Sequence, residues 1–373
     1  MKKLTLAIIV GTRPEIIRLS ETIKLADKVF NNILVHTGQN YDYQLNEIFF
    51  SELGLRAPDF YLNVVGANLG ETMGNVITKS YEILSEIKPD AILVLGDTNS
   101  VLSTISAKRL KIPIFHMEAG NRCFDLNVPE EINRKISDHV SDVNLTYTEN
   151  SRRYLISEGF RKDHIFVTGS PLNEVLCSNK KSIDSSNILE TLQLEKKKYF
   201  VVSLHREENL DLNENFINLM QTLNSVADIY KLPMIFSVHP RTKKRIENLT
   251  FQFNPLIKFI EAFGFFDYVH LQINSFCVLS DSGTISEESA ILRFPAISVR
   301  NSTERPEAIE TGSIILGGID KDVILNAIEV CLATFDFDNN LPLGYDVTNV
   351  SKRTVRIIQG YTSVINKEIW KKI

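Results

Sequence analysis

The chain has 373 residues, which is too long for one ordinary hydrophobic core, so two domains are expected. Its 43% hydrophobic and 23% charged residues are typical of a soluble globular protein. The formal net charge of -5 argues against nucleic acid or an anionic membrane as the main partner. An anionic ligand would therefore have to be bound by a local group of Arg, His and backbone N–H groups.

A short, mostly apolar run lies near the start of the sequence, at 4–10, and Arg13 and Glu15 follow it. A membrane span needs roughly 20 apolar residues, and no signal-peptide cleavage pattern follows this run. We therefore interpret it as a buried first strand. The four cysteines form no C-x-x-C pair and have no histidine at ligand spacing, so neither a disulfide framework nor a zinc site is expected. These features predict a cytoplasmic protein.

Short apolar runs alternate with longer helical patterns along the whole chain. Such alternation indicates parallel sheets that are covered by helices on both faces. The strands expected in the first half are 4–10, 33–36, 91–95, 113–116, 143–147 and 165–168. Those expected in the second half are 199–204, 234–238, 258–261, 276–279, 296–299 and 313–316. The pattern predicts an α/β fold with two Rossmann-like, doubly wound domains.

A polar, charge-rich segment at 179–198 separates the two halves. The expected organisation is an N-terminal domain at 1–172, a C-terminal domain at 173–350, and a helical segment at 351–373 that packs back on the first domain. Doubly wound sheets bind ligands at the carboxyl ends of their strands. We therefore expect the active site in the cleft between the two domains.

Three carboxylates of the first half follow expected strands or begin a helix. Asp97 belongs to the segment LGDTN, Glu118 to HMEAG, and Glu130 follows Pro129 at a helix start. Carboxylates are costly to desolvate, and a group of them repels unless it has a task or cationic partners. We interpret the three as site residues, although a helix N-cap is an alternative role for Asp97.

The segment GTRPEII, which follows the first expected strand, has the features of an anion site. Gly11 allows a tight turn, Pro14 suits the first turn of a helix, and Arg13 is placed to bind phosphate beside helix N–H groups. The alternative is a surface turn with an incidental arginine. The sequence contains no G-x-G-x-x-G or P-loop motif, so neither a dinucleotide site nor a P-loop is expected.

In the second half, basic and small residues follow the expected strands. SLHREEN places His205 after one strand, and VHPRTKK places His239 and Arg241 after the next. In SDSGTISEES, a small-residue turn precedes a helix whose N–H groups would favour phosphate, and Glu288 is placed to accept hydrogen bonds from ribose. A plain capped helix is the alternative there. A D-x-D pattern at 336–338 follows a helix and is interpreted as a solvated turn rather than a metal site.

In chain order, GTRPE, GDTN, HMEAG with PEE, SLHREEN, HPRT, SDSGTISEE and TERPE resemble the motifs of the non-hydrolysing UDP-sugar 2-epimerases nearly end to end. The resemblance implies a glycosyltransferase-B-type arrangement of the two domains and catalysis without metal or nicotinamide. The residues that it assigns to catalysis are Asp97, Glu118, Glu130 and His205. The residues that it places around UDP are Arg13, His239, Arg241, Phe266, Ser282, Gly283, Thr284, Glu288 and Arg305.

The family chemistry removes the proton from carbon 2, eliminates UDP to leave a 2-acetamido-glycal, and adds UDP back with the opposite configuration. The sequence departs from the UDP-N-acetylglucosamine 2-epimerase pattern at NRCFD after HMEAG, at HPRT, at DSGT and at 66–68, which lacks regulatory-site glutamines. These variants resemble the subfamily that converts UDP-2-acetamido-2,6-dideoxy-L-talose to UDP-N-acetyl-L-fucosamine, a capsule and O-antigen precursor. In that case Phe124 or Val128 would line a pocket for the sugar methyl group.

The alternatives are a UDP-N-acetylglucosamine 2-epimerase and a glycosyltransferase of the same fold. The resemblance also implies a homodimer, with the UDP-sugar as the other partner.

Overall fold

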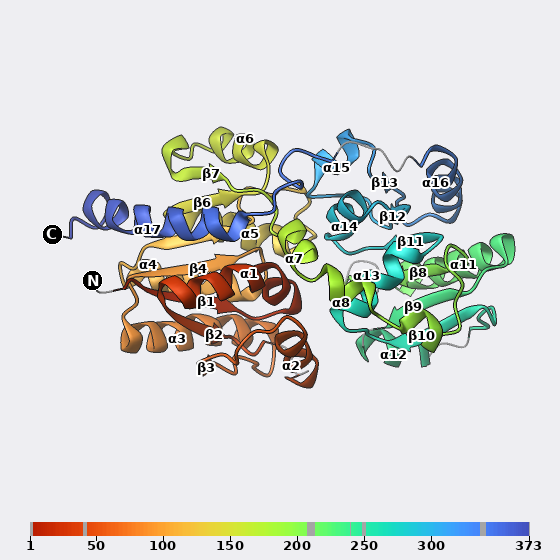
Figure 1. Cartoon of the computed structure of the whole chain (residues 1–373), viewed down its shortest axis with the longest axis horizontal. Coiled ribbons are helices and arrows are strands. Elements are labelled where there is room, and N and C mark those ends of the chain that lie inside the picture. Colours follow the sequence, from red (N-terminus) through yellow and green to blue (C-terminus); the bar gives the residue numbers. More distant parts are fainter. Residues whose placement is uncertain are drawn as a thin grey trace. The chain divides into compact units, whose positions relative to one another are not determined.

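The computed structural model describes residues 3–39, 43–206, 213–238, 240–247, 251–335 and 341–372. The chain divides into two compact units, Met1–Ser178 with Leu343–Ile373 (unit 1) and Asn179–Pro342 (unit 2), shown in Figure 1. These limits differ by several residues from the 172/173 and 350/351 expected from the sequence. The reason at the first limit is that α7 (Leu172–Ser178) contacts α1 (Arg13–Val29) of unit 1.

Unit 1 contains a seven-stranded parallel sheet with the strand order β3-β2-β1-β4-β5-β6-β7. Its strands are β1 (Thr5–Val10), β2 (Asn31–His36), β3 (Phe60–Tyr61), β4 (Ala91–Leu95), β5 (Ile114–Met117), β6 (Val143–Thr146) and β7 (Ile165–Val167). All but the two-residue β3 correspond to strands expected from the sequence. The apolar runs are buried as expected, and the five residues of β4 all belong to the core.

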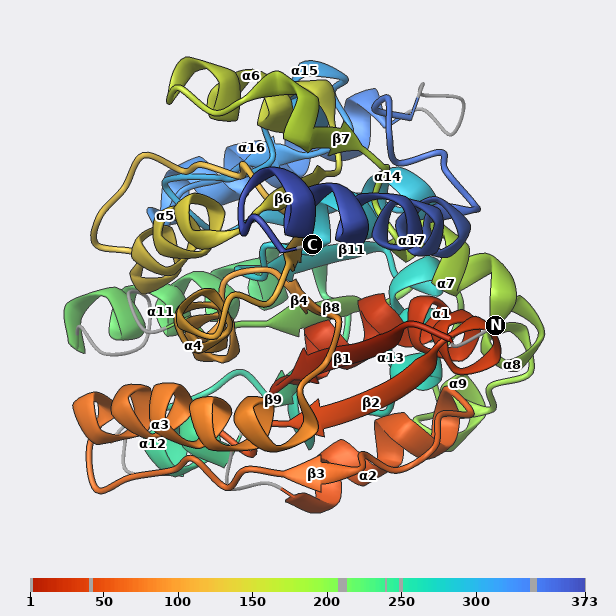
Figure 2. The ribbon, with the colours of Figure 1, turned by 90° about the vertical axis from the view of Figure 1, so that its left-hand side faces the viewer.

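The helices of unit 1 form two groups. One contains α1, α2 (Tyr43–Glu52), α7 and α17 (Val350–Glu368), which contact one another through α1. The other contains α3 (Leu69–Ile87), η1 (Asn99–Leu102), α4 (Ser103–Arg109) and α5 (Pro129–Val140). Figure 2 shows α3, α4 and α5 on one side of the strands and α1 and α17 on the other. The remaining elements are α6 (Glu149–Ser157) and η2 (Lys162–His164).

Unit 2 contains a six-stranded parallel sheet with the strand order β10-β9-β8-β11-β12-β13. Its strands are β8 (Phe200–Ser203), β9 (Met234–Val238), β10 (Ile257–Glu261), β11 (Cys277–Ser280), β12 (Ala296–Ser298) and β13 (Ile315–Leu316). Its helices are α8 (Lys180–Asp184), α9 (Ile188–Thr191), α11 (Asn213–Tyr230), α12 (Pro240–Glu247), α13 (Phe265–Asn274), α14 (Ile285–Leu292), α15 (Pro306–Glu310) and α16 (Lys321–Thr334). The core packs Phe200, Phe216 and Phe236 between sheet and helices.

Both sheets reverse their strand order at one point, between β1 and β4 in unit 1 and between β8 and β11 in unit 2. Doubly wound sheets bind ligands at the carboxyl ends of the strands that flank this point, because the loops there diverge to opposite faces. The motifs GTRPE, GDTN, SLHREEN and SDSGT follow these four strands. Among the described residues, no helix is both long enough and apolar enough to cross a bilayer.

Candidate functional site

Glu118, the first residue after β5, is held by a buried ion pair. The guanidinium of Arg18 on α1 donates to Oε2 of Glu118, and the two residues are 3% and 9% exposed. The Tyr147 hydroxyl lies 3.4 Å from the same oxygen, and the ring of Tyr147 also contacts the Arg18 guanidinium. An adjacent cation favours the ionised form of a buried carboxylate, and the ion pair fixes the position of Glu118 after β5.

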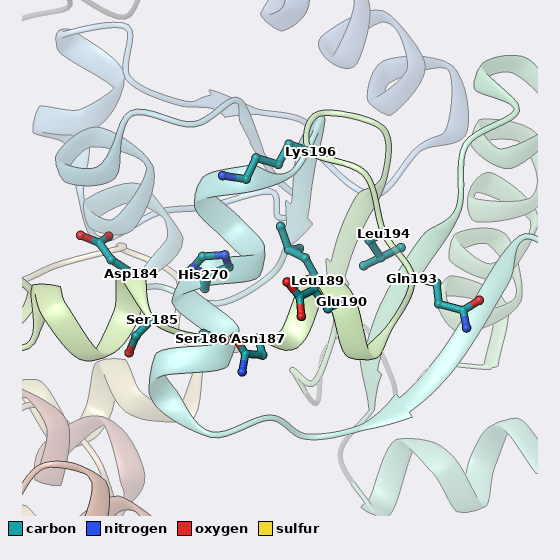
Figure 3. Close-up of a pocket in the computed structure, with 10 residues that line it drawn as sticks. All are labelled: Asp184, Ser185, Ser186, Asn187, Leu189, Glu190, Gln193, Leu194, Lys196 and His270. Carbon is teal, nitrogen blue, oxygen red and sulfur yellow. The ribbon is translucent and has the colours of Figure 1, made fainter.

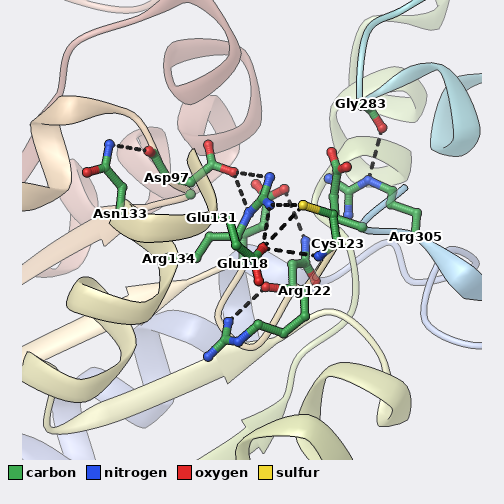
Figure 4. Close-up of polar contacts among 12 residues, drawn as sticks. Asp97, Glu118, Arg122, Cys123, Glu131, Asn133, Arg134, Gly283 and Arg305 are labelled. Atoms are coloured by element: carbon green, nitrogen blue, oxygen red, sulfur yellow. Dashed lines mark hydrogen bonds and ion pairs between the residues drawn. The ribbon is translucent and has the colours of Figure 1, made fainter. Parts of the chain in front are cut away.

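Asp97, which follows β4 by two residues, is bound by α5. Arg134 donates from Nε to Oδ2 of Asp97 at 2.8 Å, and its Nη1 lies 3.1 Å from Glu131 (Figure 4). Asn133 of the same helix donates to the backbone oxygen of Asp97 at 2.9 Å. A side chain built at Gly96 would lie 3.5 Å from the Glu118 carboxylate, so the loops that carry Asp97 and Glu118 are adjacent.

Glu130 and Glu131, neighbours in the first turn of α5, have different surroundings. Glu131 is fully buried and accepts hydrogen bonds from the backbone and thiol of Cys123 as well as from Arg134. Glu130 is only partly buried, and no hydrogen bond or ion pair joins it to a described residue. Glu131 therefore fixes the loop at Cys123, whereas none of the described residues holds the Glu130 carboxylate.

Arg13 begins α1, with Pro14 in the first turn as expected. Its guanidinium lies 5.7 Å from the ring centre of Phe49. The turn before it is fixed by Glu15, which accepts from the backbone N–H groups of Gly11 at 2.6 Å and Thr12 at 2.7 Å. Burial raises the pKa of Glu15, more than its hydrogen bonds lower it. Glu15 thus shapes the loop that presents Arg13.

In unit 2, His205 lies where β8 meets its neighbour β11. Asp281, which is fully buried, accepts the backbone N–H groups of His205 and Arg206 at 3.0 Å. The His205 Nδ1 atom lies 3.3 Å from Asp281, while the side chain remains 49% exposed. The imidazole is therefore oriented by a carboxylate and still accessible to a ligand.

The turn Ser282–Thr284 is held by Arg305. Arg305 donates from Nε to the backbone oxygen of Gly283 at 3.2 Å and pairs with buried Glu287 at 2.8 Å. A Cβ atom at Gly283 would lie 2.1 Å from a carboxylate oxygen of Glu304, so any larger residue there would require the Glu304 side chain to move. Arg305 is itself only 2% exposed, and in this structure it fixes the turn.

Glu288, in the first turn of α14, is oriented by two donors. The Thr284 hydroxyl donates to one carboxylate oxygen and Gln272 donates to the other, each at 2.6 Å. Phe266, the residue expected beside uracil, is partly buried at the start of α13 and packs against Phe265. Of the predicted UDP residues of this unit, Phe266, Glu288 and the turn Ser282–Thr284 thus lie on α13, on α14 and between β11 and α14.

Several predicted residues lie outside the described part of the chain. His239, the Arg241 side chain and the D-x-D pattern at 336–338 belong to this group. Among the residues that are described, no cluster of three or more His, Cys, Asp or Glu is arranged for a metal ion. Unit 2 also has a pocket of about 460 Å³ lined by α8, α9, the segment after α9 and His270 (Figure 3). It contains none of the predicted site residues.

Arg18, Arg134, Glu15 and Glu131 were not identified from the sequence. The sequence did indicate that the grouped carboxylates need cationic partners, but it did not indicate which arginines these are. Arg134 follows Glu130 by four residues and Glu131 by three, a spacing that is equally common in solvent-exposed ion pairs on helices.

The two sheets, each with one reversal of strand order, define an α/β protein of two Rossmann-like domains. The profile of the family described as UDP-N-acetylglucosamine 2-epimerase matches residues 24–359. The chain belongs to this family of non-hydrolysing UDP-sugar 2-epimerases, which are isomerases.

Three relatives illustrate the similarity. The structure of UDP-N-acetylglucosamine 2-epimerase from Rickettsia bellii matches 99% of this chain and 100% of its own at 47% identity and a TM-score of 0.92. The enzyme of that name from Methanocaldococcus jannaschii is 38% identical over 88% of this chain and 92% of its own. Its structure in complex with UDP-GlcNAc and UDP has a TM-score of 0.90, with 96% and 100% of the two chains covered. UDP-2,3-diacetamido-2,3-dideoxy-D-glucuronate 2-epimerase from Pseudomonas aeruginosa is 32% identical over 89% of this chain and 92% of its own.

Proposed function

We propose that this UDP-sugar 2-epimerase acts on UDP-N-acetylglucosamine and converts it to UDP-N-acetylmannosamine. The names of the relatives at 38% and 47% identity support this substrate over the L-talose derivative expected from the motif variants. The observation that carries the mechanism is that Asp97 and Glu118 lie on adjacent loops at the carboxyl ends of β4 and β5. Each of the two carboxylates is paired with an arginine.

The proposed reaction begins when a carboxylate removes the proton from carbon 2 of the sugar. The electron pair of that C–H bond forms a double bond between carbons 1 and 2, and the bond from carbon 1 to the UDP oxygen breaks. UDP leaves with the bonding electrons, so the intermediate is a 2-acetamido-glycal. UDP then adds back to carbon 1, and a proton is delivered to the opposite face of carbon 2.

Each step requires a group that the site offers. An ionised carboxylate held in a buried pocket is a suitable base, and a protonated carboxyl on the other face is a suitable acid. Among Asp97, Glu118 and Glu130, only Glu130 makes no hydrogen bond or ion pair with a described residue, so its carboxyl group is the one that the described contacts hold least. The leaving diphosphate gains charge, which Arg13 and the N-terminal end of α14 would stabilise.

The UDP moiety is proposed to bind at the turn Ser282–Thr284, with Glu288 on the ribose and the segment around Phe266 on the uracil. His205, His239 and Arg241 complete the proposed set. Because Arg13 belongs to unit 1 and Ser282 to unit 2, the proposal requires both units to bind one UDP-sugar. Small-angle scattering with and without UDP measures whether the chain becomes more compact on binding, as this proposal expects.

The second candidate substrate is UDP-2-acetamido-2,6-dideoxy-L-talose, whose product would serve capsule or O-antigen synthesis. The observation in its favour is Phe124, an apolar side chain that is 69% exposed in the segment between Glu118 and Glu130. Val128, the other residue expected to line a methyl pocket, is only 2% exposed, so almost none of its surface is open to a ligand. A methyl pocket discriminates by only about 1–3 kcal/mol, so a direct comparison is needed.

The test is to incubate the purified chain with UDP-N-acetylglucosamine or with the L-talose derivative and follow the products by NMR. A higher kcat/KM on UDP-N-acetylglucosamine is expected, and a higher value on the L-talose derivative would transfer the assignment to the second candidate. The homodimer implied by the resemblance is a separate proposal, and light scattering coupled to size exclusion measures it directly.

A further inference from the structure

His116, on β5, is fully buried two residues before Glu118 and contacts the loop that carries Asp97. Its Nε2 atom lies 2.7 Å from the backbone oxygen of Gly96, the residue before Asp97. Its Nδ1 atom lies 2.9 Å from Oδ1 of Asp138 on α5. A carbonyl oxygen only accepts hydrogen bonds, so Nε2 carries a hydrogen and donates it to Gly96.

The partners of Asp138 define the state of the other ring nitrogen. Asp138 is fully buried and accepts from Nη1 of Arg122 at 2.7 Å and from the backbone N–H of Gly120 at 3.1 Å. Burial alone would raise the pKa of Asp138, but the contacts with His116 and Arg122 lower it below its usual value. Because Asp138 is ionised, Nδ1 of His116 also carries a hydrogen. The ring is therefore an imidazolium with both N–H groups donated.

The charges around the imidazolium alternate in sign. Arg122 uses Nη1 for Asp138, while its Nε and Nη2 each donate to Glu158 at 2.7 Å. The cations His116 and Arg122 thus alternate with the anions Asp138 and Glu158, and buried charges persist when they are paired in this way. The ionisable groups that face the imidazole are Asp138 from α5 and Glu118 from the turn after β5. Burial alone would lower the pKa of His116, but Asp138 raises it.

The backbone beside this group adopts a conformation that other contacts must maintain. Glu118 has a φ angle of 64°, in the left-handed region that costs a residue with a side chain roughly 1–2 kcal/mol. Gly120 follows with a φ angle of 78°, and its N–H is bound by Asp138. His116 therefore binds the backbone of Gly96, the residue before Asp97, and Asp138 binds the backbone of Gly120, two residues after Glu118.

We propose that His116 is a positioning residue: its imidazolium, by donating to Gly96 and Asp138, fixes the separation between the Asp97 and Glu118 carboxylates. The inference rests on the proposed function for the catalytic roles of those two residues. Displacing a reacting group by about 1 Å lowers the rate on the order of 100-fold, so a small loss of this restraint has a measurable effect.

The first test is the protonation state of the ring, which does not depend on activity. In protein labelled with ¹⁵N-histidine, the ring nitrogens of His116, assigned by their absence in His116→Gln, are expected to be both protonated at pH 8. The matched control is His139, an exposed histidine on the same helix as Asp138, whose Nδ1 lies 2.9 Å from the Lys135 carbonyl. A neutral His116 ring at pH 8 would overturn the proposal.

The second test separates positioning from binding. In His116→Gln, one carboxamide cannot reach both Gly96 and Asp138, so we expect kcat to fall on the order of 100-fold while UDP affinity changes less than about twofold. His139→Gln is expected to retain wild-type kcat. A His116→Gln protein with unchanged kcat would overturn the proposal.

Asp138→Asn is the second variant if His116→Gln does not fold. Its carboxamide donates to Nδ1, so the ring is expected to become neutral at pH 8 while the hydrogen bond to Gly96 remains. A ring that stays doubly protonated in Asp138→Asn would contradict the ion pair described here. If the wild-type chain converts no UDP-sugar, the proposed function fails. The NMR result still supports or contradicts the doubly protonated His116 ring that donates to Gly96 and Asp138.

Discussion

Arg18 and Glu118 form a buried ion pair although they stand 100 positions apart in the sequence. The pair joins α1 to the loop after β5, so the helix that begins with GTRPE also holds the carboxylate of HMEAG. An uncompensated charge in this place would be costly, because both side chains are largely removed from water.

Replacing Arg18 with methionine is expected to destabilise the fold by about 3–5 kcal/mol, because it removes the cation that donates to the buried Glu118 carboxylate. Urea unfolding measures the change, and kcat is expected to fall as well. Lys24→Met is the matched control on the same helix, since Lys24 pairs with Glu21 at 2.7 Å in a solvent-accessible position. That pair is worth about 0–1 kcal/mol. Equal losses in the two variants would contradict the importance of the buried pair.

Gly120→Ala is expected to destabilise the loop that carries Glu118. The added Cβ atom would lie 2.4 Å from the backbone oxygen of Ser151, and the φ angle of 78° adds strain. Gly159→Ala is the matched control, because Gly159 has a φ angle of 90° but no atom within 4 Å of the added Cβ. The control isolates the backbone strain of roughly 1–2 kcal/mol. Thermal unfolding should show a clearly larger loss for Gly120→Ala, and similar losses would refute the close approach to Ser151.

The His116–Asp138 pair predicts a stability that declines at both ends of the pH range. The pKa of His116 is raised, so its contribution is complete below the unfolded value of 6.5 and is lost as pH rises through the folded pKa. The pKa of Asp138 is lowered, so its contribution is complete above 3.8 and is lost as pH falls through the folded pKa.

The measurement is the difference in unfolding free energy between wild type and Asp138→Asn across pH. We expect this difference to be largest between 3.8 and 6.5 and to shrink on either side. Asp184→Asn, which removes an exposed partner of Lys180, is the control and should show little difference at any pH. A difference that keeps growing above this range would contradict the assigned charges.

Glu288→Gln tests the proposed ribose contact. Hydrogen bonds to a charged group are worth about 1.5–3 kcal/mol, so the variant should bind UDP roughly 10- to 100-fold more weakly by calorimetry. The variant and wild type should bind UDP lacking both ribose hydroxyls with similar affinity. Glu329→Gln, on an exposed face of α16, is the control and should leave UDP affinity unchanged. Unaltered UDP affinity in Glu288→Gln would contradict the proposed hydrogen bonds between Glu288 and the ribose hydroxyls.

The sheets could be predicted from sequence because their strands are continuous apolar runs. The strands at 91–95 and 234–238 begin and end where the pattern placed them. Strand β3 was missed because its two residues, Phe60 and Tyr61, form no run. The chain also re-enters unit 1 at Leu343, eight residues before the expected 351, since Tyr345 is already fully buried in that unit.

The carboxylates of the candidate site could be identified by their positions after strands, whereas their cationic partners could not. Arg18 lies in the middle of α1, where nothing in the local sequence distinguishes a buried arginine from an exposed one. His116 precedes Glu118 within the motif HMEAG, but its role depends on Asp138 and Gly96, which are distant in sequence. Such pairings depend on strand order and helix placement, which the local pattern does not specify.

The central claim, proton removal at carbon 2, is tested most directly by turnover in deuterated water. Purified enzyme is incubated with UDP-N-acetylglucosamine, and the product is analysed by ¹H NMR and mass spectrometry. The proposed mechanism predicts one deuterium at carbon 2 of the UDP-N-acetylmannosamine formed, and loss of most of this turnover in Glu118→Gln without loss of UDP binding. Epimerised product that retains hydrogen at carbon 2 would contradict the elimination mechanism.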